Sequence, residues 1–219
     1  MIGVTVTIDS ADAVLDGELT VPDVALGVVV FAHGSGSSRF SPRNRAVAAE
    51  LRLRGFGTLL FDLLRPDEEE QDRRGATVRF DVALLAPRLA AAVALVRRHP
   101  ASAELPVGVF GASTGAGVAL LVAARQPSDV AAVVSRGGRP DLAGAELHRV
   151  QAPTLLVVGE RDPQVLALNR QAAAALPTAE VVLVPGATHL FAEPGALAVV
   201  SGLAADWFGR YLRPPDQPA

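Results

Sequence analysis

The 219-residue sequence contains no cysteine and no lysine, and each absence removes a class of chemistry. Without cysteine the chain has no disulfides, no thiolate nucleophile and no cysteine-ligated metal. All 20 basic residues are arginine, so no amine is available for a Schiff base with a carbonyl substrate or with pyridoxal phosphate. A P-loop phosphate site that depends on lysine is excluded as well. We expect neither a cofactor nor a metal.

Strong net charge and long apolar runs are also missing. A net charge of −3 gives no electrostatic footprint for nucleic acid or an anionic membrane. No apolar run reaches membrane-spanning length without charges or prolines. Residues 1–10 alternate Val4, Val6 and Ile8 with polar residues, which is typical of a strand and not of a signal peptide. We therefore expect a cytoplasmic protein whose partner is a small molecule, and the sequence leaves its oligomeric state open.

Apolar strand patterns and helical patterns alternate along the chain and predict an α/β fold. A hairpin over 4–8 and 13–21 comes first, and further strands are expected over 28–32, 57–61, 107–110, 130–134, 154–158 and 181–184. Helices are expected over 42–54, 78–99, 116–124, 163–176 and 196–212, with a short one near 141–149. Repeated units of this kind require a mostly parallel sheet with helices on both faces. The length fits one domain over 1–213 without a large cap domain, followed by a flexible tail over 214–219.

Two segments depart from this regular pattern. Pro87 lies inside the helical pattern of 78–99 and predicts a bend or a break there. Residues 63–77 are rich in charge, and we interpret them as a solvated loop. A flap over the mouth of a site is the alternative, because loops that follow parallel strands often carry function.

A serine stands where a buried strand runs into a helix. Residues 111–115 read Gly-Ala-Ser-Thr-Gly, which is a G-x-S-x-G turn with Ser113 at its centre. In this setting the backbone is strained and pushes the serine Oγ out above the sheet, while small neighbours allow two backbones to pass closely. Ser113 is therefore the candidate nucleophile. The alternative is an ordinary tight turn in which Ser113 only caps the helix.

A serine hydroxyl is a poor nucleophile unless a base takes its proton, and the chain has four histidines. His99 ends a helix and suits a surface cap, and no strand end fixes His148. His33 follows a strand and suits a backbone role in its loop. His189 lies in the loop that leaves the last strand, and it is the candidate base, with plain solvent exposure as its alternative.

The acid that orients the base should also follow a strand, and Asp162 does so after a tight glycine turn. Its alternative role is to cap the helix that Pro163 opens. Ser113, Asp162 and His189 then occur in the chain order of α/β hydrolases, each just past a different strand. This order favours a catalytic triad over three independent structural roles.

The oxyanion formed by attack on a carbonyl needs fixed N–H donors. The backbone of Thr114 should supply one, and Ser35 in the loop H-G-S-G-S-S of 33–38 the other, with Gly36 as the alternative. Arg136, just after a strand, is a candidate for meeting an anionic group of the substrate, and its alternative role is structural.

The same loop also imitates a dinucleotide fingerprint, because Gly34-x-Gly36 is followed by a helix, a strand and Asp62. Arg39 occupies the third glycine position and Pro42 delays the helix, so we do not predict a nucleotide site.

With these residues in place, the chain resembles an α/β hydrolase and is most similar to the dienelactone hydrolase-like group of small, capless esterases. The resemblance extends from Val28 to Leu212. It implies that Ser113 is the nucleophile, His189 the base and Asp162 the acid in hydrolysis of ester or lactone bonds. Dienelactone hydrolases carry cysteine as nucleophile, commonly followed by paired glycines, whereas this chain has Ser113 and Ala116 at those positions.

Residues 35–45 and 185–194 are also similar to hydrolases that are sometimes joined to phosphoribosyltransferase domains. We expect no phosphoribosyltransferase domain within the 219 residues. The predicted function is a serine hydrolase acting on small or short-acyl esters or lactones through an acyl-enzyme. A small-molecule receptor on the same fold and a cofactor-free perhydrolase are the alternatives.

Overall fold

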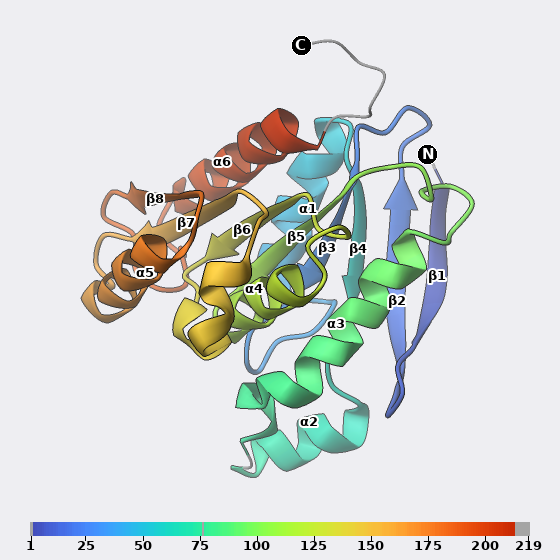
Figure 1. Cartoon of the computed structure of the whole chain (residues 1–219), viewed down its shortest axis with the longest axis horizontal. Coiled ribbons are helices and arrows are strands. Elements are labelled where there is room, and N and C mark those ends of the chain that lie inside the picture. Colours follow the sequence, from blue (N-terminus) through green and yellow to red (C-terminus); the bar gives the residue numbers. More distant parts are fainter. Residues whose placement is uncertain (1, 76, 213–219) are drawn as a thin grey trace.

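The computed structural model describes residues 2–75 and 77–212, in which an eight-stranded sheet lies between two layers of helices (Figure 1). The strands are β1 (Ile2–Asp9), β2 (Val14–Val21), β3 (Val28–Ala32), β4 (Gly57–Phe61), β5 (Val107–Ala112), β6 (Ala132–Arg136), β7 (Thr154–Gly159) and β8 (Ala179–Val184). The α-helices are α1 (Pro42–Leu53), α2 (Pro66–Arg73), α3 (Val82–Val96), α4 (Thr114–Arg125), α5 (Pro163–Ala175) and α6 (Ala196–Tyr211). Two 3₁₀ segments cover Val78–Phe80 and Pro140–Arg149.

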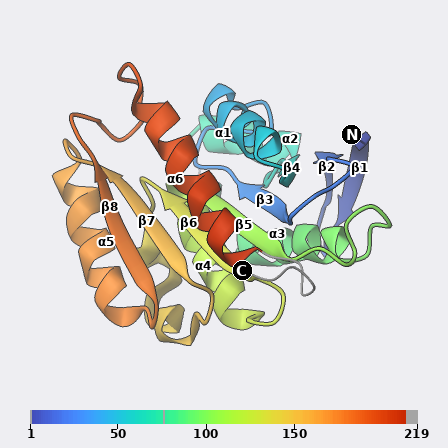
Figure 2. The ribbon, with the colours of Figure 1, turned by 90° about the horizontal axis from the view of Figure 1, so that it is seen from above.

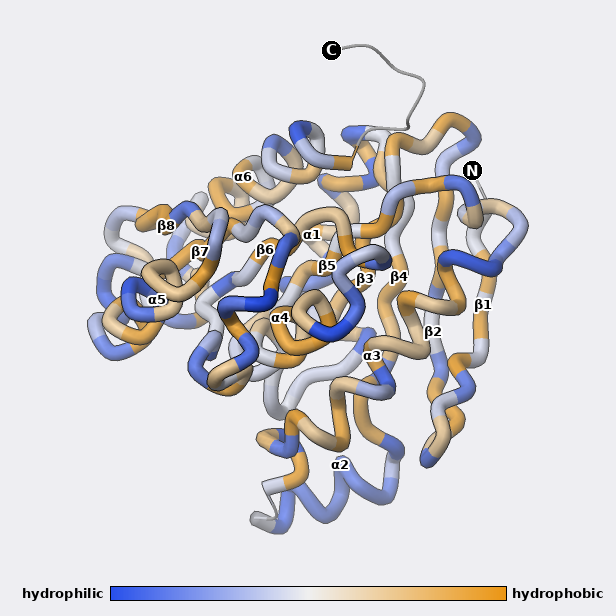
Figure 3. The backbone as a smooth tube through the Cα atoms, viewed as in Figure 1, coloured by the Kyte–Doolittle hydropathy of each residue, from blue (hydrophilic) through white to orange (hydrophobic). Residues whose placement is uncertain are grey.

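The sheet has the order β1-β2-β4-β3-β5-β6-β7-β8 and is mostly parallel. Only β2 runs against the other strands, so its pairings with β1 and β4 are antiparallel, and β1 and β2 form the predicted hairpin at one edge. The strands β3 to β7 are buried at every residue, because helices cover both of their faces. Figure 3 shows these central strands mainly in the colours of apolar residues. The predicted fold class is confirmed.

Each face of the sheet has its own hydrophobic core. Helices α3, α4 and α5 pack on one face, and α1 and α6 lie side by side on the other (Figure 2). Within the described residues no cap domain interrupts this arrangement, and the short helix α2 is the main addition between β4 and α3. The tail predicted for 214–219 and residue 213 lie outside the described residues.

The interpretation of 63–77 as a solvated loop is wrong for its central part, which is the helix α2. Pro66 opens the helix, and the Glu68 carboxylate accepts a hydrogen bond from the backbone N–H of Arg65 at 2.9 Å. Glu68 and Asp72 are buried, because each meets an arginine from outside the helix. Such distant ion pairs leave no periodic signal in the sequence.

Of the two outcomes expected at Pro87, a bend or a break, the break is absent, since α3 runs continuously through it. Asp81 caps the helix by accepting a hydrogen bond from Leu84 N–H at 3.0 Å, so residues 78–80 form a separate turn. Proline in the second turn costs the helix one backbone hydrogen bond. The buried side chains Ala86 and Leu89 on either side of it hold the helix against the sheet.

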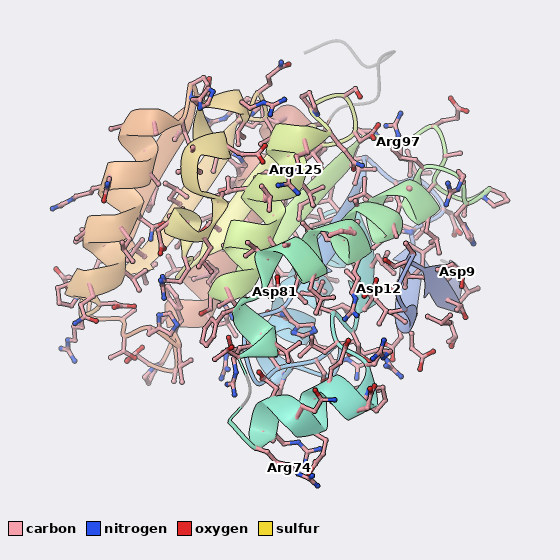
Figure 4. All side chains as sticks on the ribbon, turned by 60° about the horizontal axis from the view of Figure 1, so that its bottom comes forward. Asp9, Asp12, Arg74, Asp81, Arg97 and Arg125 are labelled. Carbon is pink, nitrogen blue, oxygen red and sulfur yellow. The ribbon has the colours of Figure 1, made fainter. Side chains whose placement is uncertain are left out.

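Arg88 on α3 is fully buried and links three segments of the chain. Its guanidinium donates to Glu68 on α2 at 2.7 and 2.8 Å and to the carbonyl of Leu63 at 2.9 Å. It also pairs with Asp12, which lies in the turn between β1 and β2 on the side of α3 (Figure 4). This network fixes α2 to the rest of the fold.

We expect Arg88→Met to destabilise the protein by about 3–5 kcal/mol, because the buried Glu68 carboxylate loses both hydrogen bonds from Arg88 and keeps only its contacts with Arg65. Chemical denaturation measures the change in the free energy of unfolding. Arg74→Met is the matched control, because Arg74 at the exposed end of α2 pairs only with Glu70 at the surface. Equal stability of the two variants would show that the network contributes no more than a surface pair.

Candidate active site

Ser113 occupies the turn between β5 and α4 in a strained conformation. Its φ is +50°, and among the described residues only Phe191 shares a positive φ without being glycine. Its side chain makes no capping hydrogen bond to α4, so the alternative role as a simple cap is not supported. Gly115 is required two residues later, because a Cβ there would collide with the backbone carbonyl of Ala32. This is the predicted strand-to-helix turn, and its serine is half-buried.

The oxyanion loop, residues 33–41 with the predicted donor Ser35, passes directly beside Ser113. A Cβ on Gly34 would lie 3.0 Å from the Cβ of Ser113, and the hydroxyls of Ser35 and Thr114 are 3.1 Å apart. Thr114 is the first residue of α4, so its N–H has no partner within the helix. No hydrogen bond in the described part of the chain uses the N–H of Ser35. The two predicted oxyanion donors therefore lie on neighbouring segments next to the serine.

Asp62, directly after β4, holds this loop in place. Its carboxylate accepts a hydrogen bond from the backbone N–H of Arg39 at 2.7 Å and pairs with the Arg39 guanidinium. A dinucleotide site would need this carboxylate for a ribose hydroxyl. Since Arg39 already occupies it, the geometry gives no support to that alternative.

His189 and Asp162 form the pair expected of a base and its orienting acid. His189 Nδ1 lies 2.7 Å from Asp162 Oδ2. The other carboxylate oxygen, Oδ1, accepts a hydrogen bond from Val165 N–H at 3.4 Å and caps α5. Asp162 therefore caps α5 with one oxygen and contacts His189 with the other, so the cap role does not exclude the predicted role as acid.

The His189 loop is anchored against the end of β7. A Cβ on Gly159 would lie 2.5 Å from the carbonyl oxygen of Ala187, so glycine is needed for this close approach. Thr188 donates through its hydroxyl to Glu193 at 2.6 Å, and Phe191 is buried in the core with a φ of +53°. Strained backbone of this kind persists only where the surroundings determine it, and here it sets the position of His189.

Ser113 and His189 meet the same short segment at the end of β6. The Ser113 N–H donates to the carbonyl of Arg136 at 3.1 Å, and a Cβ on Gly137 would lie 3.5 Å from His189 Cε1. No hydrogen bond joins the Ser113 hydroxyl to His189 among the described residues. Serine–histidine hydrogen bonds are often long in the absence of substrate, so the missing bond does not exclude a triad. The three candidate residues lie at the carboxyl ends of the parallel strands, and the triad stays a hypothesis.

The other three histidines lie in different settings. His33 is buried; its Nε2 accepts a hydrogen bond from Leu63 N–H at 2.9 Å, and its Nδ1 donates to the Gly34 carbonyl at 3.0 Å. His99 accepts a hydrogen bond in the turn after α3, and His148 is exposed in the segment that leads into β7. His33 thus fixes the start of the oxyanion loop, which is the backbone role expected of it.

Stability should fall below about pH 6.5 because of His33. Burial lowers the pKa of His33, although the hydrogen bond to Gly34 opposes this effect. The unfolded chain therefore binds the proton more readily, and the stability present above the unfolded pKa is lost by up to about 1.4 kcal/mol per pH unit on acidification. Denaturation curves between pH 5 and 8 should show a weaker pH dependence for His33→Gln. The exposed His148→Gln should follow the parent, and equal slopes in all three proteins would contradict the prediction.

A cavity of about 210 Å³ opens beside the oxyanion loop. It is lined by Gly36, Ser37, Ser38, Leu64, Glu69, Asp72, Arg73 and Arg79. A narrower hollow that shares Gly36, Ser37, Leu64 and Arg79 continues to Ser35 and Thr114. The helix α2 therefore forms a wall of the space next to the predicted oxyanion donors, and this agrees with the flap alternative better than with a solvated loop.

Arg136 is the last residue of β6 and is 8 % exposed. Its side chain makes no hydrogen bond or ion pair with the described residues, and Nη1 is shielded from solvent without a partner. Arg43 on α1 is close enough for its charge to act on Arg136. Sequence reasoning missed Arg43, although its position directly after the oxyanion loop, at the start of a helix, was a usable signal.

Two further structural findings concern metals and membranes. In the described part of the chain, no group of three or more histidine and carboxylate side chains is arranged to hold a metal ion. None of the helices in residues 2–75 and 77–212 is long and apolar enough to span a membrane.

Comparison with known proteins identifies relatives over most of the chain. The family model for the dienelactone hydrolase family matches residues 15–207. The structure of a dienelactone hydrolase from Anabaena variabilis is 52 % identical, with a TM-score of 0.93 over 97 % of this chain and 99 % of that one. A Xanthomonas campestris protein described as an α/β serine hydrolase without a lid is 21 % identical, with a TM-score of 0.75 over 99 % of this chain and 97 % of that one, and shows the fold alone.

Proteins from two strains of Mycobacterium tuberculosis, named as proposed phosphoribosyl transferases, are 58 % identical over 200 residues. These residues are 91 % of this chain but 44 % of the relatives, so the chain spans less than half of their length. On the strength of the family match and the Anabaena structure, the chain belongs to the dienelactone hydrolase family.

Proposed function

We propose that this protein is a serine hydrolase that cleaves small or short-acyl carboxylic esters or lactones through an acyl-enzyme. The observation that carries the proposal is the pairing of His189 with Asp162 at the sheet edge where Ser113 stands in its strained turn. Membership of the dienelactone hydrolase family supports a hydrolase in general.

In the first half of the proposed reaction, His189 Nε2 takes the proton of Ser113 Oγ as that oxygen attacks the ester carbonyl. Asp162 accepts the hydrogen bond from Nδ1–H, which fixes the tautomer and stabilises the imidazolium. The proposed reaction requires Ser113 Oγ and the 39 % exposed imidazole to come within hydrogen-bond distance when substrate binds. The tetrahedral oxyanion accepts hydrogen bonds from the N–H groups of Ser35 and Thr114, each worth about 3–4 kcal/mol of barrier.

The second half releases the acyl group. The C–O bond of the ester breaks, and the leaving alkoxide takes the proton from His189. A water molecule then gives a proton to His189 and attacks the acyl-enzyme. Collapse of the second intermediate releases the carboxylic acid, and the proton returns to Ser113. A lactone follows the same steps, with the alcohol and the acid remaining in one product.

The neighbouring cavity favours a small substrate. Its volume of about 210 Å³ accommodates a short acyl or alcohol portion, and one wall is formed by Glu69 and Arg73 of α2. Because it adjoins Gly36 and Ser37 of the oxyanion loop, a group bound there would keep its carbonyl near the predicted N–H donors.

We do not extend the transferase name of the M. tuberculosis proteins to this chain. The aligned region is only 44 % of the length of the proteins that carry this name. In this chain the dienelactone hydrolase family model matches residues 15–207, which is most of the chain. The dienelactone hydrolase of Anabaena supports ester or lactone chemistry as the activity to test first.

A panel of p-nitrophenyl esters of increasing acyl length tests the proposal, with Ser113→Ala as the control. We expect turnover of the short esters and a decline with chain length. No hydrolysis of any member, together with retained binding of the esters, would favour a receptor. Peroxide with a carboxylic acid, assayed for peracid, tests the perhydrolase alternative.

A further inference from the structure

Two arginines are buried in the described residues, and only one of them has bonding partners for its guanidinium. Arg88 has two carboxylates and a carbonyl around its guanidinium. Arg136 has no hydrogen bond and no ion pair, and its Nη1 is shut off from solvent. A buried charge without a partner is costly, so native proteins seldom keep one unless it has a role.

The side chain of Arg136 points to the α1 side of the sheet. Ser135 faces α4, because its Cβ and Oγ lie against Gly138 beside Ala116, whereas Val134 belongs to the core under α1 and α6. Side chains alternate along a strand, so Arg136 follows Val134 toward α1. Its backbone remains beside the nucleophile, since the Arg136 carbonyl accepts the hydrogen bond from Ser113 N–H.

A second unpaired arginine approaches from α1. The Nε of Arg43 is shielded from solvent without a hydrogen-bond partner, and its guanidinium pairs with no carboxylate in the described residues. Burial, and then repulsion from Arg43, lowers the pKa of Arg136 to about 10. Two like charges are therefore held close together with no described carboxylate between them.

The start of α1 adds to this positive field. Arg43 is the second residue of the 12-residue helix, and the first turn contains no acidic residue. The N-terminal end of a helix carries a partial positive charge. Planar arginine donors match phosphate and carboxylate oxygens in the same way. The guanidinium groups of Arg136 and Arg43 and the partial charge at the start of α1 are therefore all positive.

We propose that Arg136 and Arg43 form a binding site for an oxyanion, phosphate or carboxylate, next to the nucleophile on the α1 side of the sheet. The anion neutralises the two guanidinium groups, and side-chain movement on binding brings the shielded Nη1 and Nε into contact with it. It is either part of the substrate or free phosphate, and only the first source rests on the proposed function. This site gives Arg136 the anion-binding role predicted from the sequence and adds Arg43 to it.

Thermal unfolding with inorganic phosphate tests the site. At a phosphate concentration of tenfold Kd, and with chloride at equal ionic strength as reference, we expect the Tm of the parent protein to rise by about 3–6 °C. Arg136→Met and Arg43→Met should lose this rise, whereas Arg170→Met, at an exposed arginine, should keep it. The half-buried Arg43 keeps the test decisive if Arg136→Met does not fold. An equal rise in all four proteins, or none in the parent, would overturn the proposal.

A pair of esters identifies the source of the anion. Mono-p-nitrophenyl succinate and p-nitrophenyl butyrate have acyl chains of equal length, and only the first carries a carboxylate. If the anion belongs to the substrate, the ratio of their kcat/KM values should fall at least about tenfold in Arg136→Met. An unchanged ratio together with a lost phosphate effect assigns the site to free phosphate. Because the phosphate arm does not depend on turnover, it stands even if the esterase assignment fails.

Discussion

Replacing Ser113 with alanine is expected to lower kcat for ester hydrolysis by about 10⁵- to 10⁶-fold, which is the loss found when the nucleophile of a triad is removed. The fold should survive, because the Ser113 side chain makes no hydrogen bond in the described structure and alanine removes only the oxygen. The strained φ of +50° remains with either residue, so the turn is no worse in the variant. Turnover of p-nitrophenyl acetate in parent and variant measures the effect.

Covalent labelling provides an independent measure of the same role. A fluorophosphonate should add to the parent once, on Ser113, and should leave Ser113→Ala unmodified by mass spectrometry. Ser201→Ala is a suitable control, because Ser201 is a buried serine on α6 whose hydroxyl only bonds the carbonyl of Leu197. Retention of more than a tenth of the activity in Ser113→Ala would remove this residue from the role of nucleophile.

Asp162→Asn should reduce kcat by about 10⁴-fold while the protein stays folded. The amide can still accept the capping hydrogen bond from Val165 N–H, so α5 keeps its start. It no longer offers an anionic oxygen to His189 Nδ1–H, so the imidazole loses its fixed tautomer and the stabilisation of its charged form. Circular dichroism and kcat on the same samples separate folding from catalysis.

Glu160→Gln is the matched control for this variant. Glu160 lies two residues before Asp162 and also reaches the His189 loop, where it accepts a hydrogen bond from Gly186 N–H at 2.7 Å. Its amide counterpart keeps that acceptor, so the change in kcat should stay within a few fold. A similar loss in both variants would mean that the loop position, and not the carboxylate at 162, determines the activity.

The sequence anticipated the features that depend on local patterns. Central strands such as Val28–Ala32 are apolar on both faces, which is how buried parallel strands read, and their alternation with helices fixed the fold class. The turn around Ser113 was predictable because it needs glycine at 111 and 115, where a Cβ would collide with nearby backbone atoms. The candidate oxyanion donor Ser35 and the candidate acid Asp162 were predicted from their positions after strands, and both roles remain predictions.

The features that the sequence did not yield depend on distant partners. The charged segment that became α2 is ordered by Arg88, 20 residues from Glu68, and no local pattern signals such a pair. Helix α3 continues through Pro87 because its neighbours pack into the core, and propensity alone predicts a break there. The sequence offered Asp162 as either a cap or an acid, and only the folded chain shows that one oxygen caps α5 while the other contacts His189.

What the sequence determined by itself is the order of the chemical groups along the chain and the strands that carry them. It also offered two roles for Arg136, a contact with an anionic substrate group or a structural role, and left the burial of its side chain open. The tertiary structure decided which groups meet: His189 with Asp162, and Arg88 with Glu68. The reason is physical, since backbone periodicity acts over a few residues, whereas charge, burial and hydrogen bonding act between segments that only folding brings together.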